Sequence, residues 1–448
     1  MQRLNYEVNA HRTSRLWILA ISSWILLGAA GADDSKSTDD WLRQLEREDA
    51  GARISAAGAL GGLSKFEAKR IAPALLRALK KEEDKKVRKA VIASLGKLGS
   101  EASAAVPDLM EALKDSETRD AAVVALGEVG PEAKAAIPAL AELLADEPAA
   151  AMSLAGIGGD SIGVLVDALK AEEPTVRARS ASAIAEIAAG AHFGARQQAR
   201  LAAAVPGLTK ALKDESADVR YWAAFALGKI GPKDGDVIAA LIEALNDQDG
   251  AVRNKSSFAL SAIGDEAVPA LIEALKHQQP AVRLGAAQAL GGIHSGATAA
   301  AVPPLGKALS DTDSAVRYHA ALALKSIGAE ASAAVPELVK ALRDQDQYVR
   351  NQAGHALAEM GGVAAAAIVP ELKDAEVCYQ ALGILRRIGA ESKPVVAAVT
   401  EALKNEDEAV RYEAIRVLTK IGKEAKDAVP ELEKLSNDPS ERVREAAA

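Results

Sequence analysis

The sequence is poor in cysteine and in aromatic side chains, and each shortage narrows what the fold can be. Cys378 is the only cysteine among 448 residues. No disulfide can therefore form within the chain, and cysteine usage does not indicate the redox compartment. Aromatic residues make up 3% of the chain, whereas apolar residues make up 49%. The core must be built from Ala, Leu, Val and Ile, which suits closely packed helices.

The motifs of several common catalytic and ligand sites are also missing. No His-Glu-x-x-His segment and no Gly-Lys-Ser/Thr segment occurs. Asp247-x-Asp249-Gly250 begins like a calcium loop, but Phe258 stands where a bidentate carboxylate is needed. We expect Cys378 to be an inert structural thiol rather than a nucleophile. The sequence thus predicts no catalytic residue, no metal site and no cofactor.

Positive charge is in the minority, and no dense run of Lys and Arg occurs. The net charge is −8, and without residues 1–32 it becomes −10. Nucleic-acid-binding proteins usually carry a basic patch or stripe. The composition therefore disfavours DNA and RNA as partners, although an acidic total leaves room for a local basic patch.

Long apolar runs are confined to the N-terminus. Arg3, Arg12 and Arg15 precede an apolar stretch, which closes with Ala30-Gly31-Ala32. This order of charge, apolar run and small residues is typical of a secretory signal. We interpret residues 1–32 as a signal peptide and expect export to the periplasm or out of the cell. The alternative is an uncleaved membrane anchor at residues 16–32, since a span needs about 17–25 apolar residues.

What the sequence has in abundance is repetition. The pair Val-Arg recurs at Val219-Arg220, Val252-Arg253, Val282-Arg283, Val316-Arg317, Val349-Arg350, Val410-Arg411 and Val443-Arg444. The steps between these arginines are 33, 30, 34, 33, 61 and 33 residues. A fixed period of this length indicates a repeat architecture, which offers an extended surface rather than a single pocket.

One unit reads as two helices joined by a short polar turn. Pro303 suits the first helical turn, and a second apolar face at helical spacing runs from Val316 to Gly328. Of ten arginine copies, eight have Asp or Ser four residues earlier, which predicts helix caps. The arginine flanks the buried valine, and we expect it to bond acidic turns of the same or the next repeat.

The pattern Pro-x-Leu…Ala-Leu…Asp-x-x-Val-Arg-x-x-Ala-x-x-Ala-Leu…Ile-Gly resembles the HEAT-repeat family in its short bacterial form. It is also similar to the repeats of phycobilisome lyases. The resemblance covers nearly all of residues 41–448. It implies an all-α, right-handed α-solenoid of the armadillo/HEAT type, with about thirteen helix pairs over residues 33–448.

Three segments depart from this pattern. Residues 137–158 and 369–389 form short units, and Cys378 takes the arginine position in the second of them. Residues 189–204 are an insertion, which could be a binding loop or a longer helix. The last unit ends inside its second helix, and we expect it to cap the solenoid.

The resemblance also implies that the second helices line a concave surface. Two columns of residues point away from the core there. The tyrosine column, two residues after the valine, comprises Tyr221, Asn254, Leu284, Tyr318, Asn351 and Tyr412. The second column, six residues after the valine, comprises Phe225, Phe258, Gln288, Leu322, His355 and Arg416. Exposed aromatic residues often mark contact surfaces, although the second column could instead pack on the neighbouring repeat.

These observations predict a non-catalytic scaffold or adaptor that binds a protein or peptide along its concave face. One alternative is a phycobilin-lyase-like enzyme or enzyme accessory. Another is a nucleic-acid-binding protein, which the acidic composition disfavours. A membrane association is expected only if the N-terminal apolar segment stays uncleaved.

Overall fold

The computed structural model describes residues 36–63, 65–190, 194–389 and 393–448. The predicted signal peptide or anchor at residues 1–32 lies outside the described residues. Every regular element in the described ranges is helical, which confirms the all-α class. The chain divides into two compact units, Met1–Ala211 (unit 1) and Leu212–Ala448 (unit 2). The predicted limits of signal and solenoid stay predictions.

Unit 1 is built of α-helices with three short 3-10 helices (η) between some of them, among the described residues. They are α2 (Thr38–Gln44), α3 (Ala50–Gly61), α4 (Lys65–Lys81), α5 (Lys85–Lys97), η1 (Gly99–Ala105), α6 (Val106–Ala112), α7 (Arg119–Val129), η2 (Gly130–Ala136), α8 (Ile137–Glu142), α9 (Pro148–Ile157), η3 (Gly159–Ser161), α10 (Ile162–Ala168), α11 (Pro174–Ala189) and α12 (Ala195–Ala211). Consecutive helices pair as α2/α3, α4/α5, α6/α7, α8/α9 and α10/α11, and α12 follows them.

Unit 2 is built in the same way, of α-helices with short 3-10 helices between some of them. It contains α13 (Ala217–Ile230), α14 (Gly235–Ala244), α15 (Gly250–Ile263), η4 (Gly264–Ala267), α16 (Val268–Ala274), α17 (Pro280–Gly292), η5 (Gly296–Ala301), α18 (Val302–Ala308), α19 (Ser314–Ile327), η6 (Gly328–Ala334), α20 (Val335–Ala341), α21 (Gln347–Glu359), α22 (Gly362–Ile368), η7 (Val369–Lys373), α23 (Cys378–Ile388), α24 (Lys393–Ala402), α25 (Glu408–Ile421), η8 (Gly422–Ala428), α26 (Val429–Lys434), η9 (Leu435–Asn437) and α27 (Glu441–Ala447). From α14 to α25, consecutive helices of unit 2 pair as first and second helix, as the repeat pattern predicts.

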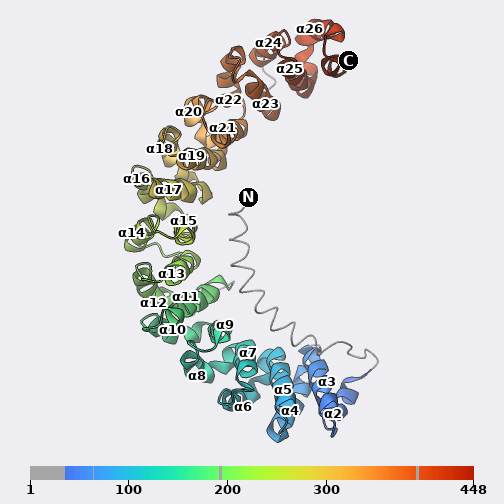
Figure 1. Cartoon of the computed structure of the whole chain (residues 1–448), viewed down its shortest axis with the longest axis vertical. Coiled ribbons are helices and arrows are strands. Elements are labelled where there is room, and N and C mark those ends of the chain that lie inside the picture. Colours follow the sequence, from blue (N-terminus) through green and yellow to red (C-terminus); the bar gives the residue numbers. More distant parts are fainter. Residues whose placement is uncertain (1–35, 64, 191–193, 390–392) are drawn as a thin grey trace. The chain divides into compact units, whose positions relative to one another are not determined.

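Each unit has two layers of helices. In unit 2 the second helices α13, α15, α17, α19, α21, α23 and α25 pack side by side, and the first helices form the other layer (Figure 1). The repeating valine is fully buried between the layers, as at Val219, Val316 and Val349. Gly328 ends α19 at a φ of 70°, a conformation that favours glycine and that turns the chain into the next unit.

Helix caps form at five of the six aspartates for which the sequence predicts them. Asp115 is the exception, because α7 begins at Arg119 with Thr118 as its N-cap residue and no capping bond from a side chain. The Asp313 carboxylate accepts hydrogen bonds from the backbone N–H groups of Ala315 and Val316, and the side chains of Asp84, Asp249, Asp346 and Asp407 cap their helices in the same way. Ser216 and Ser440 stand at the equivalent position, but their side chains accept no capping bond.

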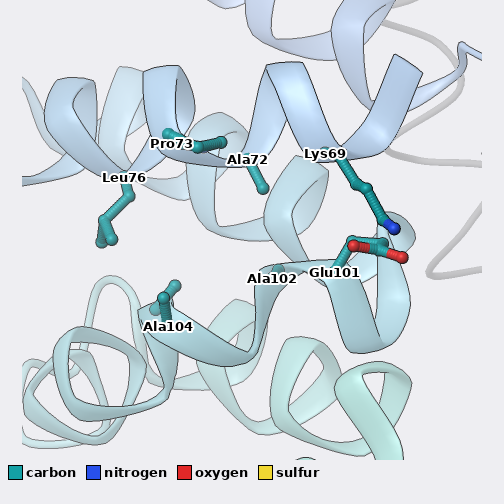
Figure 2. A pocket seen from close by; sticks show the side chains of 8 residues that line it. Lys69, Ala72, Pro73, Leu76, Glu101, Ala102 and Ala104 are labelled. Atoms are coloured by element: carbon teal, nitrogen blue, oxygen red, sulfur yellow. The ribbon is translucent and has the colours of Figure 1, made fainter. Parts of the chain in front are cut away.

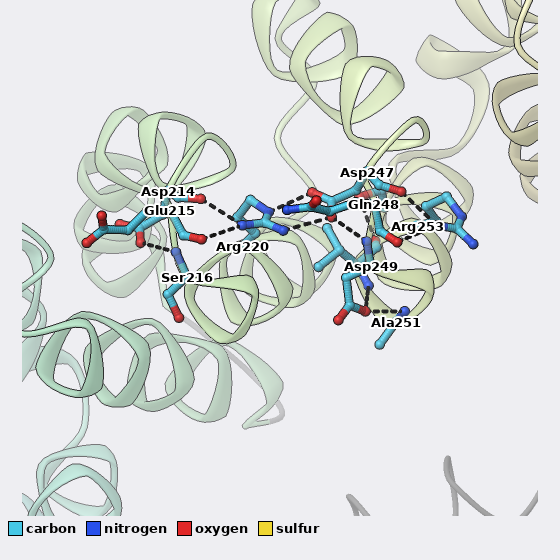
Figure 3. A network of polar contacts seen from close by, with 11 residues as sticks. Asp214, Glu215, Ser216, Arg220, Asp247, Gln248, Asp249, Ala251 and Arg253 are labelled. Carbon is cyan, nitrogen blue, oxygen red and sulfur yellow. Dashed lines mark hydrogen bonds and ion pairs between the residues drawn. The ribbon is translucent and has the colours of Figure 1, made fainter.

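As expected from the sequence, the arginine after the valine bonds its own turn, and in four repeats of unit 2 it also bonds the next turn, which makes a ladder between repeats (Figure 3). The Arg220 guanidinium donates to the Asp214 and Glu215 carbonyl oxygens of its own turn, at 2.8 and 3.0 Å. It also donates through Nε and Nη2 to both carboxylate oxygens of Asp247 in the next turn, at 2.6 and 2.9 Å. A bidentate pair of this kind fixes both distance and orientation. The ladder therefore sets the register of one second helix on the next.

The carboxylate that meets the arginine is not the capping aspartate. It is a second aspartate, two residues before the cap, and it recurs in the pairs Arg283–Asp311, Arg317–Asp344 and Arg411–Asp438. The turn that follows Arg253 differs, because His277 occupies the position of the partner aspartate. The His277 Nδ1 atom accepts a hydrogen bond from the Gln279 N–H. The sequence does carry a signal for the partner aspartate, which is an acid six residues before the arginine of the next repeat.

Most of the insertion at residues 189–204 lengthens helices. Helix α11 runs to Ala189, and α12 begins at Ala195 and continues through Pro206 to Ala211. Residues 191–193 lie outside the described residues. None of the described helices is by itself long and apolar enough to cross a membrane; α9 and the η3–α10 segment reach that length only together, across a 118° bend.

Candidate partner-binding surface

The tyrosine column lies on the second-helix layer of unit 2, with its members exposed to different degrees. Asn254 and Asn351 are exposed, whereas Tyr221, Leu284, Tyr318 and Tyr412 are half-buried. The Tyr318 ring stacks edge-on against His319, with ring centroids 5.2 Å apart. The Arg442 guanidinium lies 3.9 Å from the centroid of the Tyr412 ring. These two rings therefore contact their neighbours and are still only half-buried.

Some residues of the second column are packed against neighbouring side chains, and others are exposed. Phe225 is buried, with 8% of its surface exposed, whereas Phe258 keeps 41%. Gln288, Leu322 and His355 are half-buried, and Arg416 is exposed. Phe225 therefore belongs to the packing between repeats, which is the alternative that the sequence left open for this column.

An aromatic cluster with two lysines joins both columns on α13 and α15. Tyr221, Trp222, Phe225 and Phe258 follow one another with ring centroids 5.2 to 5.9 Å apart. The Lys255 ammonium lies 5.1 to 5.8 Å from the rings of Tyr221, Phe225 and Phe258. The Lys229 ammonium lies 5.2 Å from the Phe225 ring and 5.5 Å from the Phe258 ring. A cation over an aromatic face is attracted to the ring, so the lysines are held beside the exposed Phe258.

Two exposed aromatic residues of this layer are absent from the predicted set. Tyr379 on α23 is 54% exposed and stands two residues after Val377, in the tyrosine column. It was missed because Cys378 interrupts the Val-Arg signal in this unit. Tyr348 lies in the first turn of α21, one residue before its valine, and is 73% exposed. Because Tyr348 precedes its valine, it belongs to neither column, and it stands at a position where the repeat pattern predicts only a turn.

Positive charge surrounds His355 in the middle of the layer. Burial lowers the pKa of His355 below its usual value, and the nearby charges of Arg387 on α23 and Lys325 on α19 lower it further. The carboxylate of Glu359 on the same helix acts in the opposite direction. The two second helices that flank α21 thus each place one basic group near this half-buried imidazole.

The side chains of unit 2 that could carry chemistry include Cys378 and His319. Cys378 is buried, and burial raises the pKa of its thiol, which is the opposite of what a nucleophile needs. No group of three His, Cys, Asp or Glu side chains in the described ranges could hold a metal ion. The Nδ1 atom of His319 is buried without a hydrogen-bond partner, and burial lowers the pKa of this imidazole.

A small groove lies away from the predicted columns, on the first-helix layer of unit 1 (Figure 2). It has a volume of about 160 Å³ and lies between α4 and η1. Its walls are mostly apolar, from Ala72, Pro73 and Leu76 on one side and alanines of η1 on the other. Lys69 and Glu101 stand at one end (Figure 2). This volume is below the range of about 300–1,000 Å³ that is usual for small-molecule sites.

Comparison with known proteins identifies the repeat type. A family model described as HEAT repeats matches residues 38–116, 205–290, 268–358, 302–376 and 365–448. A model described as a PBS lyase HEAT-like repeat matches residues 118–146. No curated protein matches the chain significantly.

Solved structures that match the chain include an engineered protein, a Kap121p mutant and Kap95p, whose structure concerns its binding to RanGDP. The engineered protein is 26% identical, with 86% of this chain and 98% of that chain covered and a TM-score of 0.36. The Kap121p mutant is 14% identical, with 89% and 54% covered and a TM-score of 0.50. Kap95p is 13% identical, with 94% and 67% covered and a TM-score of 0.48. The chain spans about half the length of the Kap121p structure, and the similarity to it concerns the fold.

Proposed function

Because this chain belongs to the HEAT-repeat family, whose model matches most of its length, we propose that it is a non-catalytic scaffold or adaptor. It binds a protein or peptide partner along the second-helix layer of unit 2, the layer that lines the concave side in this family. On the sequence pattern of residues 1–32, the scaffold works outside the cytoplasm, either released or anchored by that segment.

One observation carries this proposal: side chains suited to contact follow one another along a single layer. In a solenoid whose core is Ala, Leu, Val and Ile, most of the aromatic residues of unit 2 lie on its second helices. Phe258, Tyr348 and Tyr379 are all exposed there by 41% or more. Aromatic side chains bring large contact areas at low cost in conformational entropy, and they dominate the binding energy of protein interfaces.

The test replaces three residues of the tyrosine column together, Tyr221→Ala, Tyr318→Ala and Tyr412→Ala. We expect the helical circular dichroism to stay intact and the capture of a partner from the exported fraction to fall by about tenfold or more. The matched control removes exposed apolar surface from the first-helix layer, through Val363→Ala and Val429→Ala, which are 59% and 46% exposed in the native chain. Undiminished capture by the triple variant would show that the column is not the binding surface.

The enzymatic alternative has its own measurement. A single repeat at residues 118–146 matches the model of the PBS lyase type, and repeat type alone does not establish an activity. Mixing the full chain with a bilin and following its absorbance separates the two possibilities. A stable bilin adduct would contradict a purely non-catalytic role.

A further inference from the structure

The second-helix layers of the two units differ in charge, although the chain as a whole is acidic. In unit 2, the stretches of α13 to α25 from the tyrosine-column position onward carry seven basic side chains. They are Lys229, Lys255, Lys325, Arg386, Arg387, Arg416 and Lys420. The same stretches carry two acidic side chains, Glu359 and Glu413. The net charge of the whole chain is −8, so this excess of positive charge is local.

One of these two acids is already paired. Glu413 is buried, and its carboxylate accepts hydrogen bonds from Arg386 at 2.6 Å and from Arg416 at 3.1 Å. Four other cations, Lys229, Lys325, Arg387 and Lys420, are called here the basic ridge. Apart from Glu413, Glu359 is the only carboxylate in these described stretches.

Unit 1 shows what the same layer looks like when its charges balance. Lys89 on α5 forms an ion pair of 2.5 Å with Asp120 on α7, and both residues hold the tyrosine-column position. Lys97, at the end of α5, acts on the carboxylate of Glu128 at the corresponding place in α7. The charges of neighbouring repeats therefore neutralise one another in unit 1. In unit 2 the tyrosine-column position holds no charged side chain. The position of Lys97 and Glu128 holds three cations there, against the single carboxylate of Glu359.

We propose that the basic ridge and the aromatic residues beside it bind an extended, acidic segment of a partner protein. This proposal rests on the proposed function and adds the chemistry of the partner. Carboxylates of the segment pair with Lys325 and Arg387, and its apolar side chains lie on Phe258 and Tyr379. Charge complementarity of this kind raises the association rate and selects the partner.

The spacing of the cations fits a polypeptide. Packed helices lie about 8–10 Å apart, and an extended chain advances about 3.3 Å per residue. One repeat therefore corresponds to about three residues of the segment. Lys325 on α19 and Arg387 on α23 are two repeats apart, which corresponds to about six residues.

A nucleic acid fits this surface less well. A nucleic-acid strand carries about one charge per 3.4 Å, and hence about three charges per repeat, whereas the ridge offers at most one cation per second helix. The chain outside the ridge is acidic and would repel the uncompensated phosphates. An acidic protein segment with sparse carboxylates avoids that repulsion.

The test uses the full chain and a fluorescein-labelled peptide of about 18 residues, which spans about six repeats. The peptide has glutamate at every third position and serine and tyrosine between. A second peptide has lysine in place of glutamate, and an oligouridylate of the same length probes nucleic acid. We expect fluorescence anisotropy to show binding of the acidic peptide at least about tenfold tighter than that of the basic one, weakening as salt rises.

The variant Lys325→Glu/Arg387→Glu reverses two charges of the ridge. It should weaken the binding of the acidic peptide by about tenfold or more. Lys307→Glu/Lys340→Glu is the matched control, because it changes the net charge equally on the exposed surface of α18 and α20. It should change binding by less than about twofold. Equal losses in both variants, or no preference for the acidic peptide, would overturn the proposal.

Tighter binding of oligouridylate than of the acidic peptide, lost in the ridge variant alone, would also overturn the proposal in favour of nucleic acid. Failure of the acidic-segment proposal can be distinguished from failure of the proposed scaffold function. If the triple tyrosine variant loses its partner while the acidic peptide does not bind, the acidic segment is wrong and the scaffold function stands. If neither surface binds, both proposals fail.

Discussion

The arginine that follows each core valine is the most constrained polar residue of the repeat. Arg317 is 5% exposed, and its guanidinium bonds two carbonyl oxygens of its own turn and both oxygens of Asp344. Burying a guanidinium and a carboxylate costs solvation, which the pair recovers only with complete hydrogen bonding. Removing one partner therefore leaves an uncompensated charge.

We expect Arg317→Ala to lower the free energy of unfolding by about 3 kcal/mol, because Asp344 would stay largely buried without its cation. Urea unfolding followed by circular dichroism measures this change. Arg253→Ala is the control, since Arg253 bonds the carbonyl oxygens of Asp247 and Gln248 but has His277 in place of a partner aspartate. Its loss should cost about 1 kcal/mol. Equal costs at the two positions would show that the bond to the aspartate of the next repeat adds nothing to the free energy of unfolding.

At the scale of the element, the second helices approach one another closely at small residues. A Cβ added to Gly127 on α7 would lie 2.6 Å from the Ser153 Cα on α9. The same arrangement recurs at Gly96 and Gly228, against the backbones of α7 and α15. Glycine at these positions is required by the neighbouring helix and not by its own conformation.

Two glycine substitutions separate packing from helix propensity. Gly127→Ala should destabilise unit 1 by about 1–3 kcal/mol, because two backbones would have to move apart. Gly383→Ala, in the interior of α23 with no atom within 4 Å of its added Cβ, should instead stabilise by about 0.5–1 kcal/mol. Thermal unfolding measures both variants. A loss of stability at Gly383, or none at Gly127, would contradict this account of the layer.

Local features of these elements could be predicted from the sequence, whereas contacts across repeats could not. Asp313 is a cap because its own backbone brings it to the helix start, so the pattern suffices. Asp344 meets Arg317 only through the register of one repeat on the next. Phe225 and Phe258 share a column, yet one is buried and the other is exposed, since their surroundings on neighbouring helices differ. Tyr379 follows Val377 as the others do, but a search for Val-Arg passes over it.

At the scale of the molecule, the total charge conceals how charge is distributed. The acidic composition argues against a surface that is basic throughout, and it does not locate the basic ridge in unit 2. The ridge becomes visible only when the described helices show which lysines and arginines share one layer. The carboxylates of unit 2, in turn, are concentrated in the turns, where four of them pair with the ladder arginines.

The same turns predict how stability depends on pH. Burial alone would raise the pKa values of Asp247, Asp311 and Asp344, but hydrogen bonds from the ladder arginines and from backbone N–H groups outweigh it. The pKa of each carboxyl is therefore lowered from its usual 3.8. The folded chain then binds fewer protons than the unfolded chain as the carboxyls titrate. This contribution to stability is fully present above about pH 5 and is lost as the pH falls through the lowered values.

We expect the free energy of unfolding, measured by urea titration, to fall steeply between about pH 5 and pH 2. The variant Asp247→Asn/Asp311→Asn/Asp344→Asn should be less stable at pH 7, because its arginines lose their charged partners, yet its stability should depend less on pH in this window. Asp427→Asn is the control, since Asp427 is exposed and forms no ion pair among the described residues. An unchanged slope in the triple variant would mean that carboxyls outside the ladder control the acid unfolding of this solenoid.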